Sequence, residues 1–344
     1  MGLKPVKSQP AANPCSAGVS RRELLKAAAA SAVGASLSGE LLAQESKPTT
    51  SSAPVMGDLP WWLRKDPRHA RVVDIRSKIV VRTTTVDRSE LGGMIDRGLQ
   101  ALTDERTPEL AWRYVLGDAR RIVLKFNSVG AAVLATNDTV ARVLVNRLSD
   151  AGYERETIAL VEAPAALAQE LGTREPERGW GESIPVGGNY EQLSSYLLES
   201  DAVINVPFLK THMIAGMSGA LKNLAYAVIR RPARYHDNAC APYVGQVIGA
   251  KPVASRLKLT IANTLRMVVD RGPEADERDV VDHGGLLMGF DPLAVDTLGW
   301  GVLTQARRKM GLKDLGEIPH LSAAAQSLVG RSRSAEVERL AIQT

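Results

Sequence analysis

Short, almost wholly apolar runs alternate with helix-patterned segments in the middle of this chain, and this alternation constrains the fold most. RIVLKF (121–126) and TIALVEA (157–163) have the length and β-branched content of buried strands. Between them, NDTVARVLVNRLSDAG (137–152) has helical spacing, with Asn137 or Asp138 as its cap and Gly152 as its stop. A strand–helix–strand order predicts a right-handed crossover between parallel strands.

The same pattern continues toward the C-terminus. We expect a helix over 190–200 (YEQLSSYLLES) and a strand over 201–207 (DAVINVP). The other predicted elements are strand-like 70–85, a Ser-capped helix over 89–103, a strand over 258–269, a short apolar turn at 284–289 and a helix over 291–310 capped by Asp291. These elements predict an α/β fold over 61–311, with a mainly parallel sheet and helices on both faces. The tail, 312–344, including RSRSAEVERL, is predicted to be a surface helix.

The first 43 residues read as an export signal. SRRELLK (20–26) contains paired arginines, and a weakly apolar stretch follows it up to a small residue, Ala43. This pattern predicts a cleaved twin-arginine signal, hence a periplasmic protein that meets the twin-arginine translocase during export. An ordinary amphipathic helix is the alternative, and the segment is too short and too weakly apolar for stable membrane insertion. Residues 44–60 have linker composition.

Charge and cysteine usage exclude several kinds of function. The whole chain carries a net charge of +5, but the signal holds five basic and two acidic residues, which leaves +2 for the rest. Nucleic-acid binding requires a clustered basic face, so we expect none. Cys15 lies in the signal and Cys240 stands alone, so neither an iron–sulfur cluster nor a structural zinc site of paired cysteines is expected.

One stretch, KTHMIAGMSGALKN (210–223), concentrates chemistry directly after a predicted strand. Ligands of parallel sheets bind beyond the carboxyl ends of the strands. Free N–H groups at the start of the following helix, with a lysine one turn inside, make a seat for an anion. Alternatively, the lysine is a solvated helix residue and the glycines only permit tight packing; the spacing is not that of a P-loop. The candidate site residues are Lys210, His212, Gly216, Ser218, Gly219, Lys222 and Asn223.

Four stretches, in matching order over residues 85–310, resemble the family called domain of unknown function 362. The most specific is INVPFLKTHMIAGMSGALKNLAYAV (204–228); the others are AWRYVLGDARRIVLKFN, LTIANTLRMVVDRGP and LLMGFDPLAVD. The resemblance marks Lys125 and Asn127 on one strand and Asp291 and Asp296 at a helix start. Members of the family often carry Asp where this chain has Asn263.

A more distant resemblance, to the nickel-pincer lactate racemases, implies a chemistry. Their pattern places an acid/base histidine at His212, a lysine that carries the cofactor covalently at Lys222, and a nickel ligand at His236. This resemblance implies a nickel-pincer nucleotide or another divalent metal as cofactor. The racemases use a second, upstream acid/base histidine, and His69, the one upstream histidine here, lies in a segment without a motif.

Several other residues are candidates for ligand or metal binding, and each also has a purely structural interpretation. Lys125 and Asn127 hold an anionic substrate, or the lysine is a buried ion-pair partner. Asp291 is a helix cap or, with Asp279, Asp282 and His283, part of a cation site that does hydrolytic work. The basic loop before His236 clamps cofactor phosphates or is simply solvated; its residues are Arg230, Arg231, Arg234 and Tyr235.

These observations predict an exported enzyme that performs cofactor- or metal-assisted oxidoreduction or isomerisation of a small anionic hydroxylated substrate. Histidine suits the proton-transfer role because its pKa lies near neutrality. The alternative is a non-catalytic periplasmic protein that uses the same loop to bind an anion, a ligand or a partner.

Overall fold

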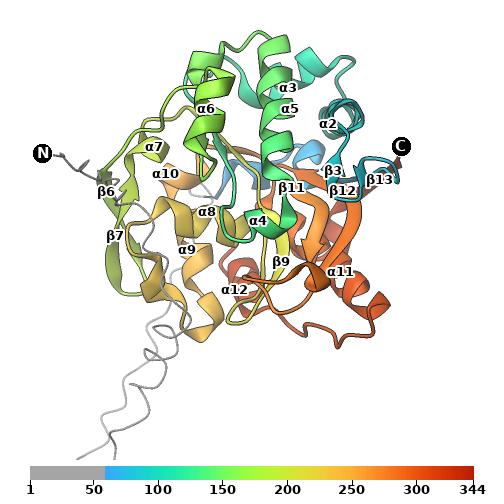
Figure 1. The fold of residues 1–344 in the computed structure, drawn as a ribbon. Helices are drawn as coiled ribbons and strands as arrows, with labels where there is room; N and C mark the ends of the chain where they lie inside the picture. The colour runs from blue at the N-terminus through green and yellow to red at the C-terminus, as the bar shows by residue number, and fades with distance from the viewer. Residues whose placement is uncertain (1–58) are drawn as a thin grey trace, which may run out of the picture. The chain divides into compact units, whose positions relative to one another are not determined.

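The computed structural model describes residues 59–344, and Figure 1 shows their arrangement as a sheet covered by helices. The sheet has the strand order β13-β1-β12-β11-β8-β4-β5, and β9 with β10 extends it beside β11. The bounds of these strands are β1 Arg71–Arg76, β4 Ile122–Lys125, β5 Ile158–Val161, β8 Ala202–Asn205, β9 Phe208–His212, β10 Gly216–Ser218, β11 Leu257–Val268, β12 Val280–Gly289 and β13 Glu338–Gln343. The predicted signal and linker lie almost wholly outside the described residues.

The pairings confirm a mainly parallel sheet. β11, β8, β4 and β5 run parallel to one another, and β13 runs parallel to β1. Two strands reverse the direction: β12 is antiparallel to both β11 and β1, and β10 is antiparallel to β9. The predicted crossover is present, because α5 (Asn137–Asp150) connects the parallel neighbours β4 and β5.

Helices cover both faces of the sheet, as expected. One face carries α2 (Arg88–Thr103), α3 (Pro108–Leu116), α5 and α6 (Ala165–Leu171). The other carries α8 (Ala220–Val228), α9 (Tyr243–Gly249), α11 (Pro292–Lys309) and α12 (Pro319–Gln326), coloured yellow to red in Figure 1. The smaller elements are β2 Val81–Arg82, β3 Thr85–Val86, α4 Ala131–Leu134, β6 Trp180–Val186, β7 Asn189–Ser194, α7 Ser195–Leu198 and α10 Lys251–Ala254.

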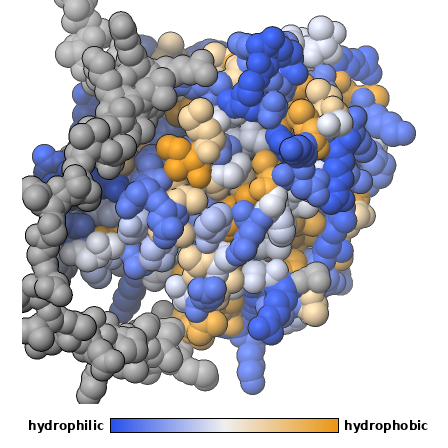
Figure 2. All heavy atoms as spheres, turned by 90° about the horizontal axis from the view of Figure 1, so that it is seen from below, coloured by the Kyte–Doolittle hydropathy of each residue, from blue (hydrophilic) through white to orange (hydrophobic). Residues whose placement is uncertain are grey.

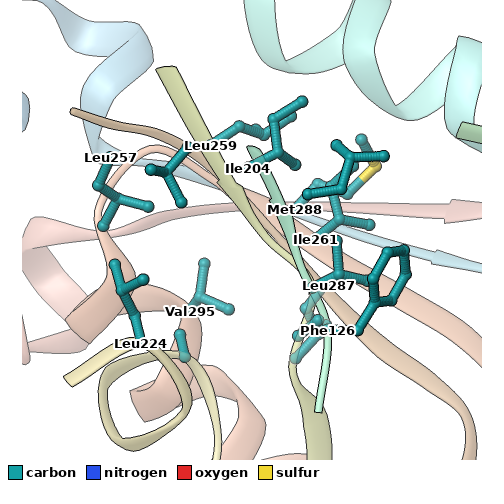
Figure 3. Close-up of a cluster of buried hydrophobic side chains, with 14 of the residues drawn as sticks. Phe126, Ile204, Leu224, Leu257, Leu259, Ile261, Leu287, Met288 and Val295 are labelled. Carbon is teal, nitrogen blue, oxygen red and sulfur yellow. The ribbon is translucent and has the colours of Figure 1, made fainter. Parts of the chain in front are cut away.

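Aliphatic side chains build most of the core. Figure 3 shows Ile204, Leu259 and Ile261 of the central strands near Met288 of β12, with Phe126 at the end of β4. Leu224 of α8 and Val295 of α11 pack below the sheet in the same view. These side chains are buried, so the hydrophobic effect fixes α8 and α11, which carry functional candidates, against the strands.

Three predicted elements are wrong in whole or in part. Of the helix predicted over 190–200, only α7 is present; residues 189–194 form β7 instead, because Gly187 and Gly188, both at positive φ, close a hairpin with β6. The apolar run 284–289 belongs to β12, which forms a long antiparallel pair with β11. The end of the tail is not a helix but β13, which pairs with β1 through alternating half-buried residues; α12 is the tail's one α-helix in the structure.

The starts of α2, α5 and α11 were predicted to within one or two residues. Asp291 caps α11 as expected, with its carboxylate accepting from the N–H groups of Leu293 and Ala294 at 3.0 and 3.1 Å. The cap of α2 is Asp87 rather than Ser89, and the cap position of α5 is Thr136. None of the helices in residues 59–344 is long and apolar enough to cross a membrane.

Figure 2 views the molecule from below Figure 1, the side toward which α9 and α12 lie. Hydrophobic patches there alternate with hydrophilic residues. The described surface also exposes two apolar residues of the β9–β10 turn, Met213 at 73% and Ile214 at 38%. The turn that follows His212 therefore presents apolar side chains to solvent.

Candidate functional site

The stretch after β8 is a hairpin, not the loop that the sequence predicts. β9 and β10 pair with His212 opposite Gly216 and Lys210 opposite Ser218. Gly216 has a φ of 75°, in the left-handed region that favours glycine, and a side chain there would press on Ile318. β9 also pairs with the carboxyl half of β11, which places Lys210 and His212 at the edge expected for ligands.

The N-terminus of α8, expected as an anion seat, is occupied by a carboxylate of the protein. Asp296 accepts from the N–H groups of Ala220 and Leu221 at 2.5 and 2.9 Å. Burial raises the pKa of Asp296 to about 7, although both N–H groups favour its charged form. These two N–H groups are therefore not free for a ligand, and Asp296 instead fixes the helix that carries Lys222 and Asn223.

Lys125 is an internal residue held by a carboxylate. Its ammonium lies 3.0 Å from Glu162 Oε1 and donates to Asn223 Oδ1 at 3.3 Å. Burial lowers the pKa of Lys125, and the charge of Glu162 opposes this shift. Asn223 in turn donates to Asn205 Oδ1 at 2.8 Å. Of the two alternatives for Lys125, the structure shows the buried ion pair, and Asn223 belongs to the same internal network.

Lys210 is buried without a carboxylate. Its ammonium donates to Asn127 Oδ1 at 3.2 Å and to the backbone carbonyl of Val129. It forms no ion pair with any described residue, and it is 1% exposed. Burial, together with the charge of nearby Lys222, lowers its pKa to about 7. Asn127 thus holds a lysine that no described carboxylate pairs with directly, although the charge of Glu162 favours its charged form.

His212 has a fixed orientation and tautomer. Its Nδ1 accepts from the N–H groups of Ile214 and Ala215, each at 3.2 Å, so the proton of the neutral ring lies on Nε2. Burial and the charge of Lys222 lower its pKa to about 2. This geometry favours a role as hydrogen-bond donor over the acid/base role that the sequence predicts.

Lys222 and His236 face one another, as the sequence resemblance implies. Lys222 Nζ lies 3.5 Å from His236 Nε2 and 4.6 Å from the ring centroid of Tyr226. The ring of His236 stacks on that of His212, with centroids 6.0 Å apart and planes 26° apart. Burial lowers the pKa of both Lys222 and His236. His236 therefore lies within the cluster, between the two residues that were expected to converge.

Two residues of the site escaped the sequence reasoning. Glu162 directly follows β5 at a φ of 57°, and its position beside Lys125 follows from the meeting of parallel strand ends. His320 of α12 is 0% exposed, and both its burial and the charge of nearby Lys222 lower its pKa. Glu162 could have been found in the sequence, because it directly follows a predicted strand. Nothing in the sequence pattern indicated His320, because α12 lies in the C-terminal tail.

The predicted cation site is not assembled. Asp282 pairs with Arg266 at 2.9 Å, Asp279 pairs with Arg271, and Asp291 caps α11. The described residues contain no group of three or more His, Cys, Asp or Glu side chains that could hold a metal ion. The expectation that Asp282, His283 and Asp291 bind a cation is therefore wrong, because arginines and backbone N–H groups occupy these carboxylates.

The remaining candidates have structural partners. In the basic loop, Arg234 and Tyr235 contact the buried carboxylate of Glu191 at 3.1 and 3.0 Å. Arg231 also pairs with Glu191, and Arg230 donates to Gln192. These contacts tie the loop to β7, while the side chains of Arg231 and Arg234 stay half exposed.

His69 lies outside the cluster, and Asn263 has a structural role. The ring of His69 packs against Trp61 and Phe290, with centroids 4.9 and 5.6 Å away. These residues help to line a depression of about 390 Å³, distinct from the cluster around Lys222. Asn263 donates to Thr136 Oγ1 at 2.9 Å, so it ties β11 to the start of α5.

Comparisons with known proteins identify a family and two structural neighbours. The model of the family described as a domain of unknown function (DUF362) matches residues 122–301. No curated protein matches the sequence. The fold is similar to the lactate racemase apoprotein of Thermoanaerobacterium thermosaccharolyticum, at 10% identity and a TM-score of 0.39, over 68% of this chain and 57% of that one. It is also similar to a structural-genomics protein of Thermotoga maritima, at 12% identity and a TM-score of 0.38, over 72% and 60% of the two chains. The chain thus spans less than two thirds of either neighbour.

Proposed function

The chain belongs to the domain of unknown function 362 family, and we propose that it is an enzyme whose site is the cluster around Lys210, His212 and Lys222. It binds a small hydroxylated anion and catalyses its oxidoreduction or isomerisation with a bound cofactor or metal. One observation carries the proposal: Lys210 and Lys222 are buried, and neither forms an ion pair within residues 59–344.

Two buried amines that lack an ion-pair partner among the described residues are energetically unfavourable. Burial lowers the pKa of both amines, that of Lys210 to about 7, so the folded protein disfavours their protonated, charged forms. A bound anion removes this penalty and restores the charged forms. The pair is therefore suited to a negatively charged ligand rather than to structural support, for which Lys125 has Glu162.

The donor set fits the cofactor that the sequence resemblance implies. Within residues 59–344 the amine of Lys222 has no carboxylate partner, so it is available for a covalent link, and His236 Nε2 faces it at 3.5 Å. Burial lowers the pKa of His236, and the backbone carbonyls of Pro232 and Ala233 oppose this shift, as expected if they accept from its Nδ1–H and leave Nε2 as the metal-binding atom. A pyridinium cofactor with nickel supplies an electrophilic acceptor for hydride.

The protein's own residues then bind and orient the substrate. Lys210 attracts its negative charge, and the Nε2–H of His212 donates to one of its oxygens. Burial of both groups excludes water from these contacts and strengthens them. Asp296 positions Lys222 by fixing the start of α8.

Calorimetric titration of the purified protein with inorganic phosphate and 2-hydroxypropanoate tests the anion site. We expect Lys210→Met to weaken binding by about tenfold or more, which corresponds to the loss of one charged contact. Lys258→Met is the matched control, because burial also lowers the pKa of Lys258, which lies near Trp61. Equal affinities of the wild-type protein and Lys210→Met contradict the proposal.

Intact mass and metal analysis of the protein from its native host separate the enzyme from its rival. We expect an added mass that Lys222→Met abolishes, together with bound metal that His236→Ala reduces. An unmodified, metal-free chain that still binds anions favours the rival function, a non-catalytic anion-binding protein. Neither measurement depends on knowing the substrate.

We also propose export through the twin-arginine route to the periplasm. The support is the sequence of residues 20–43. Replacing Arg21 and Arg22 by lysine should retain the protein in the cytoplasm, as measured by cell fractionation. Unchanged location of that variant contradicts the proposal.

A further inference from the structure

His320 of α12 is a fully buried imidazole without a hydrogen-bond partner. It is 0% exposed, and neither ring nitrogen forms a hydrogen bond of normal geometry within the described structure. Buried polar atoms nearly always have a hydrogen-bond partner, because leaving one unpaired destabilises the folded protein. An unpartnered side chain of this kind therefore indicates a missing partner.

The neighbours of His320 belong to the site already described. Burial and the charge of Lys222 together lower its pKa to about 4, and the carbonyl of Ala215 opposes the shift. The preceding Ile318 lies against Gly216 of the hairpin. His320, which lies about a hundred residues later in the sequence, therefore packs beside the hairpin. Ala215 contacts both histidines: its carbonyl lies near His320, and its N–H donates to His212.

A count of donors and acceptors shows what His320 adds. Lys210 and Lys222 are donors, and His212 offers only its Nε2–H. A neutral His320 whose ring N–H is directed toward the Ala215 carbonyl keeps a lone pair on its other nitrogen. The site then contains several donors for an anion and one unpartnered acceptor, which matches a ligand that itself has a donor.

We propose that His320 is a ligand-binding residue that accepts a hydrogen bond from a hydroxyl group of the anion held by Lys210 and Lys222. The ligand class is then a small hydroxycarboxylate rather than a plain carboxylate. This inference rests on the proposed anion site and adds the residue that selects for the hydroxyl group.

Calorimetry with two probes that differ by one hydroxyl group, 2-hydroxypropanoate and propanoate, tests the inference. We expect the full chain to bind the hydroxy acid at least about tenfold more tightly. His320→Leu should remove this preference and leave propanoate binding within about twofold. His283→Leu is the matched control, because His283 is also a mostly buried histidine with an unpartnered Nε2, and its neighbours are Arg76 and Asp74.

The outcomes distinguish the inference from the proposed function. If the wild-type protein binds neither probe, the anion site itself fails. If it binds both equally, or if His320→Leu keeps the preference, the role of His320 is overturned while the anion site stands.

A measurement on the wild-type protein guards against a variant that fails to fold. Nitrogen-15 spectra of the histidine side chains should show one ring nitrogen of His320 changing on addition of 2-hydroxypropanoate, and not on addition of propanoate. The same change with both probes, or no change with either, overturns the inference.

Discussion

Asp296 of α11 lies directly against Gly219, the residue that precedes α8. A Cβ added at Gly219 would come within 2.1 Å of Asp296 Oδ1, the oxygen that accepts from the N–H of Ala220. The glycine that the sequence assigns to a ligand therefore makes room for a carboxylate of the protein. Through this contact, the position of Lys222 depends on a residue 74 positions away in the chain.

Replacing Gly219 by alanine should destabilise the protein by about 3 kcal/mol, because the added methyl group displaces Asp296 from two backbone donors. Urea unfolding measures the change. Gly301→Ala is the control, since a Cβ there meets nothing within 4 Å and α11 gains a better helix former. Equal unfolding midpoints for the two variants contradict the role of Gly219.

The stability of the unliganded protein should rise with pH between about 7 and 10.5, in part because of Lys210. In that window the unfolded chain binds the proton of Lys210 and the folded protein does not, so raising the pH favours folding. Lys210→Met should have a smaller slope in urea unfolding across these pH values. A slope identical to that of the wild-type protein would mean that the folded pKa of Lys210 is not lowered.

Ligand binding should show the opposite dependence on pH. An anion prefers the charged lysine, so its affinity should fall as the pH rises above about 7, the pKa of Lys210. Titration of phosphate at several pH values checks this, with Lys210→Arg as the control because arginine stays charged. Phosphate itself changes its ionisation with pH, but equally in both titrations. The difference in pH dependence between the wild-type protein and Lys210→Arg therefore reports on Lys210.

Glu162 and Lys125 should behave as one unit. Glu162→Gln leaves the lysine buried without a counter-charge and should cost about 2 kcal/mol, less than a fully buried pair because the glutamate side chain is 33% exposed. Adding Lys125→Met should recover most of this loss. Unfolding of both single variants and the double variant gives the coupling energy, and strict additivity would exclude the pairing.

The sequence predicts the part of the fold that depends on local pattern. The strand before Lys125, the strand before Pro207 and the helix after Asp291 are present, because apolar runs and helix caps act over a few residues. The pairing of β12 and β13 with β1 was not predictable in this way. It joins residues more than 200 positions apart, and only the sheet as a whole decides it.

The candidate site shows the same division. Lys210, His212 and Lys222 lie in one stretch, and the structure gathers them, together with His236, at the expected edge. The sequence pattern did not reveal that Asp296 occupies the helix start or that His320 enters from the tail. Both residues reach the cluster through packing of distant helices.

Deleting residues 338–344 should destabilise the protein by about 3 kcal/mol, because β1 loses a neighbour. The deletion also removes Arg339, which lies 2.6 Å from the buried carboxylate of Asp74. Arg339→Ala is the matched variant and should cost less, since Asp74 keeps its contact with Arg76 at 2.9 Å. Thermal unfolding compares the two, and a deletion without effect contradicts a structural role for β13.

The strand order has a consequence for synthesis on the ribosome. β1 is made well before its two neighbours in the sheet, β12 and β13. Until these neighbours have been made, its apolar residues, Val72, Val73 and Ile75, lack their partners in the sheet. The nascent chain therefore needs protection from aggregation at this edge during that interval.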